Sequence, residues 1–424
     1  MRLSLGVVLC LLVCTTVFAA DRARVRVVTI HDPITPVTAQ FLHRTLDDAA
    51  RNGDSLVLVE LDTPGGMDTA MRQIVKNIFA STTPLAVYVA PSGARAASAG
   101  AYICLAADVC AMSPGTNIGA AHPVTPGEKA DKIMEEKLVN DAEAYAEGIA
   151  RKRGRNETLA RRMVRDSISL SADKALSGKI IDLIAQDRAE LLQQLEGRRI
   201  THNGREMVLR LAGAEAIPAE MRPGERILNA ISNPNVAYVL MMLGMLGLFF
   251  ELSNPGVILP GVIGGISLIL AFFAFQALPV NYAGVLLILL ALVFFIAEIK
   301  VVSHGMLTVG GVIAMVFGSL LLFESPASYL RVSWSVILVT VLATAGFFSV
   351  AIAKALRVHR LKPATGPEGL LEQEGHAESE IAPEGKVFVN GEYWDAWSDQ
   401  PIAAGSRVMV ERVAGMRLKV RKVI

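Results

Sequence analysis

The chain has 424 residues, of which 52% are hydrophobic and only 19% are charged, and the apolar excess is concentrated between residues 227 and 353. This excess excludes a wholly soluble protein and indicates an integral membrane protein. A net charge of +1, with no long basic run away from the membrane flanks, predicts no general affinity for nucleic acid.

Residues 1–19 are predicted to be a signal peptide. Arg2 gives it a positive start, residues 3–18 are apolar, and Ala19 and Ala20 precede a charged pair, as at a signal peptidase site. An uncleaved anchor helix is the alternative. In both cases we expect the segment that follows to be exported.

Residues 20–190 are predicted to form an α/β domain. Short runs rich in Val, Ile and Leu alternate with helical patterns, which is typical of a mostly parallel sheet covered by helices. Functional sites of such sheets lie at the carboxyl ends of the strands. The predicted strands are 25–29, 55–61, 85–90 and 109–112, and the predicted helices are 37–52, 67–79, 97–107 and 129–153.

Two strand-to-helix turns carry residues that suit acyl transfer. Gly65 and Gly66 would let backbone N–H groups face a cleft, which is half of an oxyanion hole. Ser98 lies where a helix is predicted to start, so its hydroxyl would be a nucleophile and the N–H of Ala99 a second donor. The alternatives are a tight turn that happens to contain two glycines, and small residues that only let a helix pack closely on a sheet.

A serine nucleophile needs a base within hydrogen-bonding distance. His122 is the nearest histidine after Ser98, and a desolvated lysine is the other choice. Lys137 shares a helical face with small and polar residues, Asn140 among them, whereas a solvated lysine on an acidic helix is the alternative. Three lysines fall on the segment in question: Lys129, Lys132 and Lys137.

Three segments carry a family resemblance: DTPGG at 62–66, AASAGAYI at 96–103 and GTNIGAAHP at 115–123. In order and spacing they resemble the membrane-bound, ClpP-class serine proteases of the NfeD family, also called stomatin operon partner proteins. Lys137 with Asn140, and GRN at 154–156, fit the same pattern. The resemblance implies a ClpP/crotonase-like fold in which a serine–lysine dyad replaces the catalytic triad.

By position, the resemblance implies that Ser98 is the nucleophile and Lys137 the base. Gly65, Gly66 and Ala99 would supply the oxyanion-hole amides, and the choice between the two glycines stays open. The substrate cleft is expected to be lined by Met67, Ile118, Gly119 and Asn140.

Other residues of this domain have less defined roles. Asp166 is expected either to orient the lysine or to be a surface residue at a helix end. Cys104 and Cys110 are expected to be small buried residues, with a disulfide as the alternative. Neither a metal-binding spacing nor a cofactor is predicted. Residues 191–226 become polar and hairpin-like, which predicts an adaptor to the membrane.

Residues 227–355 are predicted to form a multi-pass transmembrane region of a bacterial-type inner membrane. A span needs about 20 apolar residues, and one of four uncharged runs is long enough for two spans. Lys300 and the basic residues after the last span predict that these sides are cytoplasmic, with Arg331 as an exception, so the α/β domain would be extracytoplasmic. The five predicted helices are 233–251, 256–278, 282–299, 304–323 and 333–354.

An internal repeat is present in this region, because Glu251 and Glu298 each precede a pair of spaced glycines. Small residues at such spacing predict close helix packing, and a membrane-embedded substrate groove is the alternative.

Residues 356–382 are predicted to be a linker, and residues 383–424 a small β-barrel that resembles the OB-like C-terminal domain of the NfeD family. Some OB folds bind nucleic acid through stacking aromatics. Trp394 and Trp397 are more typical of a barrel core, however, and the resemblance implies protein interaction. This domain is predicted to be cytoplasmic. Its predicted strands are 386–389, 392–396, 407–413 and 417–420.

Two classes of function follow. The first is a membrane-anchored serine endopeptidase that acylates Ser98 and cleaves hydrophobic segments of proteins such as stomatin-like partners, as the resemblance implies. The second is a noncatalytic membrane scaffold that assembles with stomatin/SPFH-type proteins. A crotonase-type acyl-CoA enzyme is a distant third, because the domain is predicted to be exported. A homo-oligomer, a dimer or larger, is expected in either case.

Overall fold

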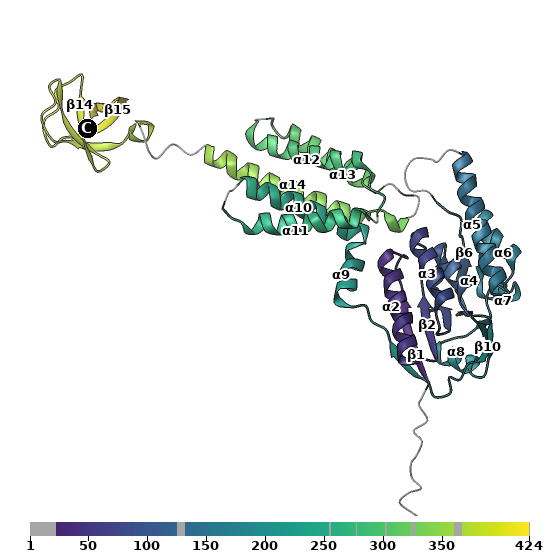
Figure 1. The fold of residues 1–424 in the computed structure, drawn as a ribbon. Coiled ribbons are helices and arrows are strands. Elements are labelled where there is room, and N and C mark those ends of the chain that lie inside the picture. The colour runs from purple at the N-terminus through teal and green to yellow at the C-terminus, as the bar shows by residue number, and fades with distance from the viewer. Residues whose placement is uncertain are drawn as a thin grey trace, which may run out of the picture. The chain divides into compact units, whose positions relative to one another are not determined.

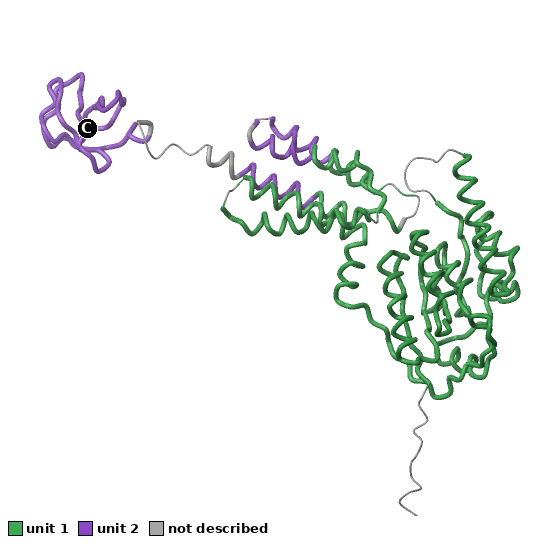
Figure 2. The backbone as a smooth tube through the Cα atoms, viewed as in Figure 1, with its two compact units in different colours: residues 1–290, 314–341 green, residues 291–313, 342–424 purple. Residues whose placement is uncertain are grey.

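The structure is a computed structural model. It describes residues 23–124, 132–253, 256–276, 278–301, 303–323, 325, 328–359 and 367–423, so the predicted signal peptide lies outside the described residues. Figure 1 shows the elements in chain order. The chain divides into two compact units, one of residues 1–290 and 314–341 and the other of residues 291–313 and 342–424 (Figure 2).

A six-stranded, entirely parallel sheet forms the centre of the N-terminal domain, in the order β11-β1-β2-β3-β5-β8. Its central strands are buried on both faces, which is why they read as continuous apolar runs rather than alternating ones. The predicted parallel sheet is therefore confirmed. The strands are β1 (Arg24–Ile30), β2 (Leu56–Leu61), β3 (Leu85–Val89), β5 (Val109–Met112), β8 (Leu183–Ile184) and β11 (Glu215–Pro218).

Helices cover the sheet, and two separate apolar clusters mark its two faces. Leu61 and Val59 belong to the cluster under α2, α3 and α4, whereas Leu58 and Tyr88 belong to the cluster that contains Leu191 of α8. The helices are α2 (Pro36–Asn52), α3 (Asp68–Ala80), α4 (Ala99–Ala106), α5 (Lys132–Lys152), α6 (Glu157–Arg165), α7 (Ala172–Ser177) and α8 (Arg188–Leu195).

The domain extends past the predicted boundary at residue 190. Leu191 and Leu195 of α8 are fully buried against the sheet, and β11 pairs in parallel with β1. Residues 191–218, predicted to be an adaptor, thus belong to the folded domain. The predicted hairpin is present within them, as β9 (Arg199–His202) and β10 (Arg205–Val208).

A second, three-stranded sheet lies beside the ends of the first. It consists of β4 (Arg95–Ala97), β6 (Asn117–Gly119) and β7 (Ser169–Ser171), with β6 parallel to β4 and antiparallel to β7. A bridge between Thr63 and Ala96 joins it to the turn after β2. This small sheet positions the turn that contains Ser98.

Helix α9 (Pro223–Ile231) connects the domain to the membrane region. Arg44 of α2 holds it through two hydrogen bonds to Glu225, of 2.8 and 2.7 Å. The hydrogen bond from Arg44 lowers the pKa of the Glu225 carboxyl. The geometry is a bidentate guanidinium–carboxylate pair, the strongest form of such contacts.

Five apolar helices follow, and their positions match the five predicted ones. Three of them are long and apolar enough to cross a membrane, namely segments 234–253, 282–299 and 334–353. Two are apolar but shorter, so five spans stays a prediction. The helices are α10 (Pro234–Ser253), α11 (Leu259–Phe275), α12 (Tyr282–Lys300), α13 (Met306–Leu321) and α14 (Trp334–His359).

Small residues let these helices approach closely. A Cβ on Gly247 would lie 2.6 Å from the Pro260 carbonyl oxygen, and one on Gly264 would lie 2.8 Å from the Leu248 nitrogen. The acids of the repeat bind the turns that follow them: the Gly256 N–H lies 3.4 Å from Glu251, and the Gly305 N–H 3.0 Å from Glu298. The two acids of the repeat thus cap the turns that follow them, whereas the close helix contacts are made by other glycines, Gly247 and Gly264.

The C-terminal part forms a closed barrel, in the order β12-β13-β14-β16-β15. The predicted barrel is confirmed, but its first strand, β12, lies inside the predicted linker and pairs with both β13 and β15. Trp394 packs against the apolar core of the barrel. The strands are β12 (Glu374–Ala377), β13 (Glu384–Val389), β14 (Glu392–Trp397), β15 (Arg407–Ala414) and β16 (Arg417–Lys422).

Candidate active site

Ser98 occupies a strained turn between β4 and α4. Its backbone has φ 52° and ψ −116°, a combination that is costly for a residue with a Cβ. The Ser98 N–H donates to the Gly119 carbonyl over 2.9 Å, and the Ala101 N–H donates to the Ser98 carbonyl over 3.0 Å. These bonds fix the strained conformation and leave the hydroxyl half-exposed, as at a nucleophile elbow.

The glycine turn lies directly against this serine. A Cβ on Gly65 would lie 2.8 Å from the Ser98 Cβ and 3.2 Å from its Oγ, and Gly65 has φ +128°, so only glycine fits. The fully buried Thr63 closes the turn: its Oγ1 accepts from the Gly65 N–H at 3.2 Å and donates to the Gly65 carbonyl at 3.0 Å. This role of Thr63 could not be predicted from the sequence.

The glycine turn and the start of α4 each have one backbone N–H group without a partner in the described part of the chain. The Gly65 N–H is bound by Thr63, but in the described part of the chain no hydrogen bond engages the N–H of Gly66 or of Ala99. Ala99 is the first residue of α4, where N–H groups have no partner within the helix. Unpaired N–H groups in a buried setting are rare and available to an incoming oxygen.

Lys137 is not brought together with Ser98. It lies in the first turns of α5, where residues 132–138 are all exposed, and among the described residues no hydrogen bond joins it to the serine. Large apolar side chains flank it on the same turns, with exposed fractions of 65% for Ile133, 52% for Met134 and 40% for Leu138. Lys129 lies outside the described residues.

Two other polar residues face α6 instead of the serine. Asp166 ends α6, is exposed and accepts a hydrogen bond from Arg162 at 3.1 Å, which fits the alternative of a surface residue at a helix end. Asn140 is also exposed and accepts a hydrogen bond from Arg165.

The remaining predicted residues lie close to the serine turn. Met67 starts α3 and lines a cavity beside Gly66. Gly119 receives the Ser98 N–H and has φ +134°, so it positions the serine, while its neighbour Ile118 is buried in β6. His122 uses Nδ1 to contact the Val164 carbonyl at 3.0 Å.

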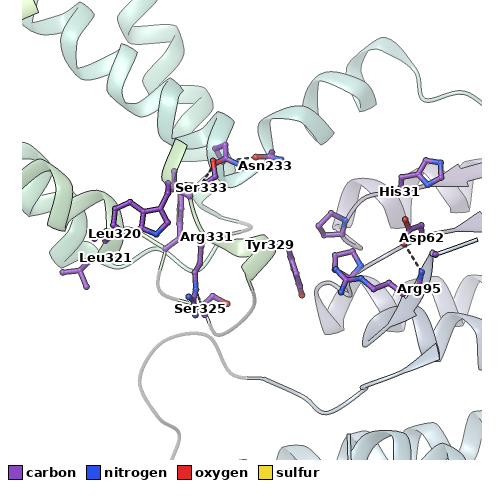
Figure 3. A pocket seen from close by; sticks show the side chains of 17 residues that line it. His31, Asp62, Arg95, Asn233, Leu320, Leu321, Ser325, Tyr329, Arg331 and Ser333 are labelled. Carbon is purple, nitrogen blue, oxygen red and sulfur yellow. Dashed lines mark hydrogen bonds between the residues drawn. The ribbon is translucent and has the colours of Figure 1, made fainter. Parts of the chain in front are cut away.

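Two cavities, with volumes of about 1060 and 590 Å³, are bordered by residues of the glycine turn at 62–66, and Ser98 is not among the described residues that line them. Asp62 and Arg95 line the larger one, where the Arg95 N–H donates to the Asp62 carboxylate at 3.0 Å (Figure 3). Gly66 and Met67 line the smaller one together with apolar side chains of the membrane region. Tyr329, from the loop between α13 and α14, lines both, and burial raises the pKa of its hydroxyl.

Both cysteines of the described chain, Cys104 and Cys110, are free and buried, as expected, and burial raises the pKa of the Cys104 thiol. No cluster of three or more His, Cys, Asp or Glu side chains suited to a metal occurs within the described residues.

Two known proteins match this chain over almost its whole length. The chain is 36% identical over 406 residues to the membrane-bound protease PH1510 of Pyrococcus horikoshii, covering 93% of this chain and 92% of that protein. The similarity thus extends over almost the whole length of both chains. It is also 27% identical over 424 residues to the membrane protein NfeD1b of Bacillus subtilis, covering 95% and 94% of the two chains.

Three family descriptions match consecutive parts of the chain: the N-terminal domain of NfeD1b at 24–215, the NfeD integral membrane domain at 235–354, and the NfeD-like C-terminal, partner-binding domain at 367–422. The chain belongs to the NfeD family.

Solved structures of 1510-N, a membrane-bound stomatin-specific protease, match the N-terminal half. A lysine-to-alanine mutant in complex with a substrate peptide is 32% identical with a TM-score of 0.46, covering 49% of this chain and 97% of that one. A serine-to-alanine mutant is 33% identical with a TM-score of 0.45, covering 47% and 99%.

Proposed function

We propose that this protein is a membrane-anchored serine endopeptidase that cleaves peptides through an acyl-enzyme on Ser98. The observation that carries the proposal is the strained serine held against a glycine turn, together with two N–H groups, those of Gly66 and Ala99, that have no partner among the described residues. Backbone strain at a polar side chain is characteristic of functional sites. The class of the 36% identical relative supports the same conclusion.

The chemistry follows from these groups. The Ser98 Oγ attacks the peptide carbonyl, and the oxygen that becomes negative accepts hydrogen bonds from the N–H groups of Gly66 and Ala99. The base takes the hydroxyl proton and then gives it to the leaving amine, which leaves an ester on Ser98. Water, deprotonated by the same base, hydrolyses the ester and regenerates the serine.

We assign the base to Lys137, which the family resemblance implies. A lysine can act as a general base only when its ammonium is taken out of water. The exposed apolar side chains Ile133, Met134 and Leu138 provide the surface for this, because a substrate segment or a second copy of the chain covering them would also cover Lys137. In this proposal the dyad is assembled on binding, and the protein works as a homo-oligomer.

Hydrophobic segments are the proposed substrates, including those of stomatin-like membrane proteins. The 590 Å³ cavity beside Gly66 supports this choice, since its walls carry apolar side chains such as Ile34, Met67 and Leu278. The solved relatives are described as specific for stomatin or a stomatin homolog, and the C-terminal domain matches a partner-binding family.

We further propose a multi-pass inner membrane location, with the α/β domain outside the cytoplasm and the barrel inside. Single cysteines placed at Gly204 and Gly415, both in open turns, test this. An impermeant thiol reagent added to intact cells should label only the first, and labelling of the second alone would reverse the orientation.

The decisive experiment uses the full chain in detergent with a fluorophosphonate probe and an apolar peptide. Wild type should be labelled and should cleave the peptide, Ser98→Ala should do neither, and Lys137→Ala should lose both. Lys132→Ala, one turn earlier on the same exposed part of α5, is the matched control and should keep both activities. Peptide cleavage that survives in Ser98→Ala would leave the noncatalytic scaffold for stomatin/SPFH-type proteins as the function.

A further inference from the structure

A tyrosine of the membrane region reaches the serine turn. Tyr329 belongs to a single helical turn, Ser328–Leu330, between α13 and α14. Its hydroxyl lies 3.4 Å from the point where a Cβ on Gly65 would sit, and the Ser98 Oγ lies 3.2 Å from the same point. The two hydroxyl groups therefore face one small volume, although 231 positions separate them in the sequence.

Tyr329 also lies between the two cavities. It lines both cavities, and only Pro33 and Asn233 share that property among their described lining residues. Figure 3 shows the ring between the side chains of Arg331 and Ser325 and those of Asp62 and Arg95. The ring thus lies between a cavity of about 1060 Å³, whose walls are both polar and apolar, and a mainly apolar one of about 590 Å³.

The loop that carries Tyr329 is held from the membrane side. Arg331 donates to the Ser325 carbonyl, and the Ser333 N–H donates to Asn235 at the start of α10 over 2.8 Å. In the described part of the chain no hydrogen bond binds the Tyr329 hydroxyl itself. Its place thus depends on the path of the loop and the packing of the ring, and a small shift of α13 or α14 would move it.

We propose that Tyr329 is a gate over Ser98, supplied by the membrane region, which a substrate segment must displace to reach the serine. With the side chain in place, its hydroxyl group occupies volume next to Gly65 that a peptide carbonyl would need. With the ring withdrawn, an extended apolar chain can run from the smaller cavity across Ser98 into the larger one. The inference rests on the proposed role of Ser98 as the nucleophile, but access to position 98 can be measured without that role.

The first test measures access alone, on the full chain in detergent carrying Ser98→Cys. N-ethylmaleimide is the probe, and the parent protein, whose Cys104 and Cys110 are buried, gives the background. If the gate is open in about a tenth of the molecules, Tyr329→Ala should raise the labelling rate about tenfold. Tyr329→Phe keeps the ring but loses the hydroxyl group that lies nearest to Gly65, so its labelling rate should rise by less than that of Tyr329→Ala. Tyr282→Ala is the matched control, because Tyr282 is 79% exposed at the start of α12 and lines neither cavity.

Two results of the labelling experiment would overturn the gate. Equal labelling rates in Tyr329→Ala and its parent overturn the gate, and so does an equal rise in Tyr329→Phe, since the ring would then not be what blocks access. If Tyr329→Ala does not fold, Tyr329→Leu, which is shorter but apolar, is subject to the same criteria.

The second test keeps Ser98 and follows fluorophosphonate labelling and peptide cleavage. Tyr329→Ala should raise both by the factor found with the thiol probe. If thiol access rises but Ser98 reacts with neither the fluorophosphonate nor the peptide, the gate stands and the proposed protease function fails. If Tyr329→Phe loses cleavage, the hydroxyl takes part in the reaction and the gate is overturned.

Discussion

The two edges of the parallel sheet differ in whether their polar groups have hydrogen-bond partners. At the amino edge, Asp108 is almost fully buried and is bound by the Leu85 N–H at 2.9 Å, by Arg153 at 2.5 Å and by His202 at 3.1 Å. At the carboxyl edge, the N–H groups of Gly66 and Ala99 have no partner within the described residues.

A second buried cation repeats the pattern of the amino edge. Arg155 donates to the carbonyls of Leu105, Ala107 and Ile180 and pairs with Asp182 at 2.9 Å. Satisfied buried charges contribute to stability, whereas unsatisfied donors and a strained serine cost stability and are retained where chemistry needs them. We infer that the amino edge stabilises the domain and the carboxyl edge carries the reactive groups. Mutations at the amino edge should therefore change stability, and mutations at the carboxyl edge should change activity.

The largest effect should come from Ser98→Gly. It removes the nucleophile, so kcat/KM for peptide cleavage should fall by at least about 10⁴-fold. It also relieves the positive φ, so the α/β domain should become more stable, by about 1 kcal/mol. Peptide kinetics and thermal unfolding of the full chain in detergent measure the two effects. Ser92→Ala, at an exposed serine in the loop before β4, should change neither. A less stable Ser98→Gly protein would show that the turn is not strained.

The next largest effect should come from Arg155→Ala at the other edge. Three carbonyls and the Asp182 carboxylate would lose their donor, which should destabilise the domain by about 3–5 kcal/mol. Activity per folded molecule should stay unchanged. Arg151→Ala is the control, since Arg151 pairs with Glu147 and Glu157 on the surface and should leave the unfolding midpoint in place. A loss of activity per folded molecule in Arg155→Ala would contradict the separation of the edges.

Much of this arrangement could be predicted, because the signals are local. Apolar runs predicted the strands, and the turn residues Gly65, Gly66 and Ser98 follow strands directly. Strand β11 could not be predicted, since Glu-Ala-Ile-Pro is short, mostly exposed and contains a proline. Strand β12, Glu-Gly-His-Ala, is polar and closes the barrel only through its partners.

The parts of the site that could not be predicted depend on the path of the chain. Tyr329 reaches the serine turn only because α9 and α10 place the membrane region against it. The choice between the two glycines depends on which N–H the Thr63 hydroxyl binds. Lys137 could be chosen by resemblance alone, because helical periodicity cannot say how far a side chain lies from a turn some 40 positions earlier.

Thr63→Val should have a smaller effect that falls on both properties. The shape is kept but the bonds to Gly65 are lost, so stability should fall by about 1–2 kcal/mol. The glycine turn should also shift relative to Ser98, lowering kcat/KM about tenfold. Thr45→Val is the matched control: its hydroxyl is equally buried but bonds only to the Phe41 carbonyl within α2. It should lose similar stability and no activity. Equal activities of the two variants would remove Thr63 from the site.

The smallest expected effect is that of pH on the hydrogen exchange of α5. This helix carries Lys137 near its start and is followed by Arg153 at the amino edge. Halfway along, the buried Glu143 accepts hydrogen bonds from Arg165 at 2.7 Å and Arg161 at 2.8 Å, which fastens α5 to α6. The hydrogen bond from Arg165, with that from Arg161, lowers the pKa of the Glu143 carboxyl.

Because that pKa is lower in the folded than in the unfolded chain, the stabilisation from Glu143 is complete above the unfolded value of about 4.3 and is lost as the pH falls through the lower folded value. Hydrogen exchange of α5 and α6, corrected for intrinsic rates, should therefore be equally slow at pH 7 and pH 5 and faster only below about pH 4. Glu143→Gln should remove this step and leave α5 less protected at all pH values. Protection should in every case rise along α5 from the exposed turns around Lys137 toward Arg153. Equal protection along the whole of α5 would contradict the proposed difference between the two edges of the sheet.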